Sequence, residues 1–181
     1  MTTVLGRNTN QPLKITSGTI LSLKATVPLP YQSRFFAHFG PLNLNLFNEN
    51  DDILLYISFS GAKITFMDRA HRSIGDGWGE AQTVDIKHMD SMKGRSVHNV
   101  TVSIYYYLTD SELGRYQILL NGTTICHFNQ RLPGPAIRIS YLRDMGEQLA
   151  PSSWSPSSWA VDVFQVDDLL PEERGALVPG R

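Results

Sequence analysis

The residue of this sequence best suited to bind a ligand is a tryptophan between two glycines. Trp78 lies between Gly77 and Gly79, directly after a polar and charged stretch over residues 68–76. The face of an indole ring packs against apolar C–H groups, such as those on one face of a sugar, and shields them from water. Most large aromatic side chains of β proteins are core residues, which is the alternative interpretation of Trp78. The flanking glycines and the charged stretch favour the binding role.

Polar side chains surround this tryptophan in the sequence. Arg69, His71, Arg72, Asp76 and Glu80 all lie within ten residues of it. Polar groups that a rigid sheet holds in place fix the orientation of ligand hydroxyls through paired hydrogen bonds. The alternative interpretation is a solvated loop, and it is stronger for His71 and Arg72 than for Arg69 or Glu80. The pattern therefore indicates a candidate binding surface around the tryptophan.

The elements that must position these side chains are three strand-like runs within residues 42–82. Apolar and polar residues alternate there with the period of half-buried strands, so a one-residue slip in register would exchange core and surface. We expect one face to be apolar, and it carries Leu42, Leu44, Leu46, Ile53, Leu55, Ile57, Phe59, Ile64 and Phe66. We expect the opposite face to be more polar, and it carries Asn43, Asn45, Leu54, Tyr56, Ser58, Ser60, Thr65 and Met67.

The rest of the chain also consists of short strand patterns separated by turn signals, and no long helical period occurs. Asn121-Gly122 is the strongest two-residue hairpin signal available. Further strands are predicted within 13–23 (with a turn at Ser17-Gly18), 34–39, 78–86, 99–107, 116–128, 137–142 and 159–166. About a dozen short antiparallel strands can bury two inner faces against each other. The sequence therefore predicts an all-β, two-sheet antiparallel sandwich.

The order of these elements resembles the galectin family, in particular the galectins of fungi. The matching segments are LNLNLFNENDDILLYISF, KITFMDR, DGWGEAQ and GRYQILLNGTTICHFNQRL. The resemblance implies a galectin-like jelly-roll domain over residues 13–166, a flexible lead-in over 1–12 and a C-terminal tail over 167–181. It further implies a non-enzymatic lectin with a glycan ligand, and self-association into homo-oligomers.

The resemblance also implies where a ligand would bind. The family places His, Asn and Arg at alternate positions of one strand, an Asn on the next strand, and a Trp followed by Glu-x-Arg. These positions correspond here to Tyr56, Ser58, Ser60, Met67, Trp78, Glu80 (with one residue fewer after the Trp) and Gln82, and Arg69 is added from the neighbouring loop. Most of the family's galactoside-binding side chains are thus replaced, which implies a non-standard glycan specificity with weak or no lactose binding.

Two alternatives remain open at this point. Tyr56 and Met67 either form a second apolar platform beside Trp78 or fill the groove and close it. In the second case the chain would be a galectin scaffold without sugar binding, acting as a protein-interaction or assembly module.

Charge and hydropathy argue against several classes of partner. The net charge is −1 and the Lys and Arg residues are scattered, so nothing indicates binding to nucleic acid or to an anionic membrane. No run approaches the ~18 apolar residues of a membrane span. The N-terminal residues lack the apolar segment of a signal peptide. We therefore expect no membrane insertion and a cytoplasmic protein, which could be secreted by a route without a signal peptide.

The sequence offers no catalytic, metal or cofactor motif. Glu49, Asp51 and Asp52 lie in a predicted turn, whereas glycoside hydrolysis needs two carboxyls that face each other across the substrate. The five histidines occur singly, without metal-ligand spacing. Cys126 is the only cysteine, and within a strand pattern it is expected to be a small buried hydrophobe. We expect no enzymatic activity and no cofactor.

Overall fold

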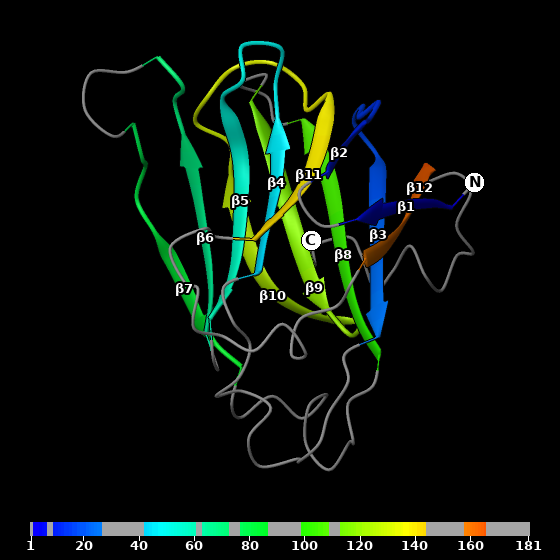
Figure 1. Cartoon of the computed structure of the whole chain (residues 1–181). Helices are drawn as coiled ribbons and strands as arrows, with labels where there is room; N and C mark the ends of the chain where they lie inside the picture. The colour runs from blue at the N-terminus through cyan, green and yellow to red at the C-terminus, as the bar shows by residue number, and fades with distance from the viewer. Residues whose placement is uncertain are drawn as a thin grey trace.

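In a computed structural model, most of the described residues belong to strands. The residues described are 2–6, 9–26, 42–60, 63–72, 77–86, 99–108, 113–143 and 158–165. Within these ranges twelve strands form two antiparallel sheets of six, and no helix occurs (Figure 1). The prediction of an all-β, two-sheet sandwich is confirmed. None of the described segments is a helix able to cross a membrane.

The two sheets, called sheet A and sheet B, are packed face to face, and in Figure 1 sheet B lies in front of strands β8 to β10. Sheet A consists, in spatial order, of β1 (Thr3–Gly6), β12 (Ser158–Gln165), β3 (Thr19–Thr26), β8 (Asn99–Leu108), β9 (Gly114–Leu120) and β10 (Thr123–Asn129). Sheet B consists of β2 (Thr9–Pro12), β11 (Arg138–Arg143), β4 (Leu42–Phe47), β5 (Ile53–Ser60), β6 (Lys63–Arg69) and β7 (Gln82–Asp85).

The hydrophobic core fills the space between the sheets. Alternate residues of each strand point inward, as the two-residue period of a strand requires. Leu44, Ile57 and Phe66 of sheet B and Val102 and Ile118 of sheet A are all buried there. Because one face of every central strand is buried in this way, the register of each strand is fixed, and its outward side chains have defined neighbours.

The N-terminal residues differ from the expected lead-in. Strand β1 pairs with β12 at the edge of sheet A, and β2 pairs with β11 at the edge of sheet B. The side chain of Leu5 is completely buried, which anchors β1 to the core. The polar sequence of this segment did not predict strands. Edge strands can form from such a sequence, because they need only one partner and a few apolar contacts. Residues 13–18 form no strand, and the predicted strand over 34–39 and the tail over 167–181 lie outside the described residues.

Strand β5 contains a bulge that the alternation pattern did not predict. Leu55 pairs with Leu46, yet the next pair on that side joins Ile53 with Phe47. Leu54 and Leu55 are therefore both buried, and Ile53 turns to the outer face. The alternation pattern had predicted the reverse for two of them, with Ile53 on the apolar inner face and Leu54 on the more polar face. A bulge inserts one extra residue into a strand and reverses the facing of the residues beyond it. It gives the outer face of sheet B an additional apolar residue.

The hairpin prediction at Asn121-Gly122 is confirmed. Both residues have positive φ, 48° for Asn121 and 84° for Gly122, as a type I′ turn requires. The side-chain oxygen of Asn121 accepts a hydrogen bond from the backbone N–H of Thr101 at 2.8 Å. The turn thereby joins β9 to β10 and also to the neighbouring strand β8.

Candidate ligand-binding face

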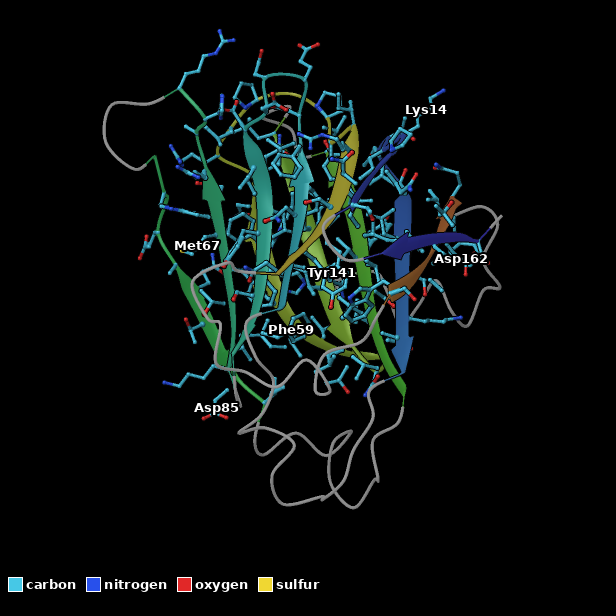
Figure 2. All side chains as sticks on the ribbon, viewed as in Figure 1. Lys14, Phe59, Met67, Asp85, Tyr141 and Asp162 are labelled. Atoms are coloured by element: carbon cyan, nitrogen blue, oxygen red, sulfur yellow. The ribbon has the colours of Figure 1, made fainter. Side chains whose placement is uncertain are left out.

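The outer face of sheet B is built from three rows of side chains that run across the strands. Residues directly opposite each other on paired strands share a face, so the pairing defines each row. The first row contains Arg138, Phe47, Ile53, Arg69 and Trp78; the second contains Asn10, Ser140, Asn45, Tyr56 and Met67; the third contains Asn43, Ser58, Thr65 and Thr83. Figure 2 labels Met67 on β6, near the edge formed by β7.

An aromatic pair occupies one end of this face. The ring centroids of Tyr56 and Trp78 are 5.1 Å apart with an interplanar angle of 68°, an edge-to-face contact. The guanidinium carbon of Arg69 lies 5.3 Å from the centroid of the Trp78 ring. Trp78 is half-buried, so it is not the core residue of the alternative interpretation. The pair supplies an apolar surface with a positive charge beside it.

Backbone hydrogen bonds hold the segment that carries this tryptophan. The N–H of Gly79 donates to the carbonyl of Asp68 at 2.9 Å, and the N–H of Ala70 donates to the carbonyl of Gly77 at 2.9 Å. Trp78 itself forms an isolated β-bridge with Arg69. The tryptophan is therefore fixed on both sides to the end of β6, rather than carried by an independent loop.

A partly buried ion pair supports the same segment from the other side. The carboxylate of Asp68 is buried and accepts hydrogen bonds from Arg131, at 2.6 Å from Nη2 and 3.1 Å from Nε. The bond to Asp68 raises the pKa of Arg131 above its usual value. The preceding residue, Gln130, is buried and accepts a hydrogen bond from the hydroxyl of Tyr116 at 2.9 Å. The position of Trp78 thus depends on contacts that reach into the core.

We expect Gly79→Ala to destabilise the fold and displace Trp78. A Cβ atom at Gly79 would overlap Oδ1 of Asp68 and lie 3.0 Å from its Cγ. Overpacking of this kind costs about 1–3 kcal/mol of unfolding free energy. Thermal unfolding followed by tryptophan fluorescence measures the effect. Gly6→Ala is the matched control, because its Cβ would lie no closer than 3.7 Å to Thr9. Equal melting temperatures for the two variants would contradict the proposed support of Trp78 by Asp68.

The second and third rows carry amide and hydroxyl groups. The hydroxyl of Tyr56 donates to Oδ1 of Asn43 at 3.0 Å, and Nδ2 of Asn45 donates to Oγ of Ser140 at 3.3 Å. Oδ1 of Asn45 is buried, and none of the described residues donates a hydrogen bond to it; the residue is only 2% exposed. A buried acceptor without a donor is costly. Sequence reasoning placed Asn43 and Asn45 on this face without assigning them to the site.

The far end of the face is closed by a second arginine. The guanidinium carbon of Arg138 lies 4.0 Å from the centroid of the Phe47 ring, and its Nη2 lies 2.6 Å from Oδ1 of Asp51. The Asp51 turn is itself ordered by Asn48, whose side-chain oxygen accepts from the backbone N–H groups of Asn50 and Asp52. The acidic turn predicted from the sequence is thus a structural turn. Arg138 was not predicted, since only strand pairing brings it beside Phe47.

The structure brings most of the predicted binding residues together. Those on the outer face of sheet B are Tyr56, Ser58, Met67, Arg69 and Trp78. Glu80 is exposed in the segment between Trp78 and β7, and the side chain of Ser60 lies outside the described residues. Gln82 does not share the face, because it pairs with the inward-facing Phe66, and its Oε1 accepts from Sγ of Cys126 at 3.3 Å.

Cys126 is buried, as predicted. Its residue is 8% exposed, and burial raises the pKa of its thiol to about 11. The thiol is therefore almost entirely protonated near neutral pH, and a protonated thiol is a poor nucleophile. Among the residues that the structure describes, no group of three or more His, Cys, Asp or Glu side chains could hold a metal ion.

Solved structures with a similar fold are galectins. Sheep galectin-11 in complex with glycerol has a TM-score of 0.58, 15% sequence identity, and coverage of 88% of this chain and 99% of its own. A tetrameric galectin from the sponge Cinachyrella sp. has a TM-score of 0.55, 18% identity and coverage of 87% and 99%. Toad ovary galectin in complex with thio-digalactose has a TM-score of 0.52, 14% identity and coverage of 90% and 96%. The chain therefore has a galectin-like fold.

The sequence matches no protein-family model and no curated protein. At the low identities of the structural neighbours, the likeness extends to the fold alone.

Proposed function

We propose that this protein is a galectin-like lectin, not an enzyme, and that it binds a glycan on the outer face of sheet B. The observation that carries the proposal is the pairing of a half-buried Trp78 with Tyr56 at 5.1 Å, on the same face as the unpaired acceptor Oδ1 of Asn45. A sugar ring presents an apolar C–H face and a rim of hydroxyls. An aromatic platform beside amide and hydroxyl groups complements both of these features.

The fold supports this choice of ligand. Two of the structural neighbours are complexes with hydroxylated small molecules, glycerol and thio-digalactose. The proposal extends to self-association, as in the tetrameric sponge neighbour, since several copies of one weak site bind a multivalent glycan with increased avidity.

The proposed glycan is not a simple β-galactoside. Tyr56 and Met67 occupy neighbouring positions on β5 and β6, where the family resemblance implies polar sugar-binding groups. The hydroxyl of Tyr56 is engaged by Asn43, so the centre of the face is more apolar than a galactoside site would require. A ligand with an extended apolar face, held by contacts along the second row of side chains, which contains Asn45, fits this arrangement better.

Replacing Trp78 with alanine is expected to weaken glycan binding by about 1–3 kcal/mol while the fold stays intact. Aromatic anchors of this kind contribute most of the binding energy in small interfaces. A glycan array of the wild-type protein identifies the saccharide, and titration calorimetry of the wild type and Trp78→Ala with that saccharide measures the loss.

Phe164→Ala is the matched control for this experiment. Phe164 is also half-buried, but it lies on β12 of sheet A rather than on sheet B, and its removal should leave glycan affinity unchanged. Unchanged affinity in a folded Trp78→Ala protein would refute the assigned face. An array without any reproducible saccharide would instead support the alternative function, a scaffold that binds another protein.

A further inference from the structure

The outer face of sheet A carries a second polar cluster, on the opposite side of the molecule. Six outward-facing residues of β8, β9 and β10 form two adjacent rows of three, and we call them the Arg115 cluster. The rows are Tyr105–Gln117–His127 and Tyr107–Arg115–Asn129. This cluster lies outside the face proposed above and makes no contact with Trp78.

Within the described part of the chain, four polar atoms of this cluster are buried and have no hydrogen-bond partner. They are the hydroxyl of Tyr107, Nε of Arg115, Oε1 of Gln117 and Nε2 of His127. Gln117 is only 3% exposed, and its Nε2 donates to Oγ1 of Thr124 at 2.9 Å, so the amide is held with its oxygen unpaired. Each buried polar atom left unpaired costs about 1–3 kcal/mol. Folded proteins contain few such atoms, so four in one cluster point to a missing partner.

The charges of the cluster indicate what kind of partner is missing. The guanidinium carbon of Arg115 lies 6.0 Å from the centroid of the Tyr107 ring, and no carboxylate of the described residues forms an ion pair with it. Burial and the positive charge of Arg115 lower the pKa of His127, so its imidazole is neutral near pH 7. The cluster therefore carries one positive charge, the unpaired donors of Arg115 and Tyr107, and the unpaired acceptor of Gln117.

We propose that the Arg115 cluster is a second ligand site, which takes a sugar ring bearing a carboxylate, that is, a uronic acid. The carboxylate accepts hydrogen bonds from Nε of Arg115 and the hydroxyl of Tyr107, and a ring hydroxyl donates to Oε1 of Gln117. Arg115 and Tyr107 are half-buried, and the proposal requires them to separate so that the ring can enter.

The size of the cluster favours a small ligand over a protein partner. It spans three neighbouring strands and two outward positions along each strand. The spacings of a sheet give it a width of roughly 10 Å across the strands and a length of roughly 7 Å along them. This area matches one or two sugar rings, whereas a stable protein interface covers roughly 800 Å² on each partner. The inference is independent of the proposed function, since it concerns the other sheet.

The test is a titration of the full chain with sodium glucuronate, followed by NMR of the side-chain N–H groups. We expect the Arg115 Nε–H and Gln117 amide signals to shift, and glucose at the same concentration to leave them in place. Tyr107→Phe removes one hydroxyl without changing the packing, and Arg115→Gln removes the charge. Each is expected to weaken glucuronate binding by roughly 10- to 150-fold, as the loss of one hydrogen bond to a charged group implies.

Three results would overturn the inference. One is the absence of shifts at Arg115 and Gln117, the second is equal shifts with glucose and glucuronate, and the third is unaltered affinity in a folded Tyr107→Phe protein. Trp78→Ala separates the two sites, because it is expected to leave the glucuronate shifts unchanged. Glucuronate that shifts only the Trp78 indole signal would refute the second site and leave the proposed function standing.

Discussion

Lactose is expected to bind this protein too weakly for titration calorimetry to measure. In the galectin family, to which the sequence shows a resemblance, His, Asn and Arg surround the axial hydroxyl of galactose and distinguish it from glucose. The sequence resemblance implies that Tyr56, Ser58 and Ser60 occupy these positions here. Discrimination of this kind is large only where the wrong sugar leaves polar groups of the site unpaired. Serine hydroxyls are too short to replace an arginine or an imidazole, and they carry no charge to strengthen the bond.

The structure adds two reasons for this expectation. Met67 stands opposite Tyr56 on β6 and offers no useful hydrogen bond where the family has an asparagine. Gln82, to which the resemblance assigns the place of the family's second arginine, pairs with an inward-facing residue and accepts a hydrogen bond from Cys126, so its amide faces away from the site. Each lost hydrogen bond to a charged group is worth roughly 1.5–3 kcal/mol, and the loss of several exceeds what one tryptophan restores.

The lactose titration needs a positive control, which is the saccharide found on the glycan array, measured under the same conditions. Sub-millimolar lactose binding would show that neighbouring groups such as Arg69 have taken over the recognition of galactose.

Replacing Trp159 with alanine is expected to lower the unfolding free energy by about 3–5 kcal/mol. Trp159 lies on β12 of sheet A and is only 1% exposed. Its ring centroid is 6.5 Å from that of Phe59 and 6.4 Å from that of Tyr141, and both of these residues belong to sheet B. Figure 2 labels Tyr141 near the middle of the sandwich and Phe59 below it. The indole therefore joins the two sheets, and its loss removes a large part of a total stability that is typically 5–15 kcal/mol.

Urea unfolding of the wild type, Trp159→Ala and Trp159→Phe measures this contribution. The phenylalanine variant keeps a ring between the sheets and removes an indole N–H that is buried without a hydrogen-bond partner, so it should lose much less stability. A loss below about 1 kcal/mol for Trp159→Ala would contradict the central packing role of this residue.

Much of the fold could be predicted because it depends on local periodicity. Alternation over residues 99–107 and the Asn121-Gly122 turn signal specify a strand and a hairpin without knowledge of their partners. The strand prediction at 159–166 is confirmed for the same reason, since β12 spans Ser158–Gln165. The placement of Tyr56 and Met67 on one face also follows from alternation, once β5 and β6 are paired, whereas Trp78 joins that face through its bridge to Arg69.

The remaining features of the site depend on contacts between residues far apart in sequence. The bulge at Leu54-Leu55 arises from the pairing of β5 with both neighbours, and no local pattern marks it. Asn45 meets Ser140, 95 positions away, only through the pairing of β4 with β11. The ion pair of Arg131 with Asp68 joins the loop after β10 to β6. The alternation in a single sequence therefore predicts which side chains of a strand share a face, but it does not predict which other strands pair with that strand.

The most direct test of the account is an NMR titration of the ¹⁵N-labelled protein with the strongest saccharide from the glycan array. Of the three tryptophans in the sequence, Trp78 provides an indole N–H signal on the outer face of sheet B and Trp159 provides one in the core. We predict that the saccharide shifts the Trp78 indole signal together with the backbone signals of β5 and β6, and leaves the Trp159 indole signal in place. Shifts confined to other strands, with the Trp78 signal unmoved at saturation, would contradict the proposed glycan-binding face.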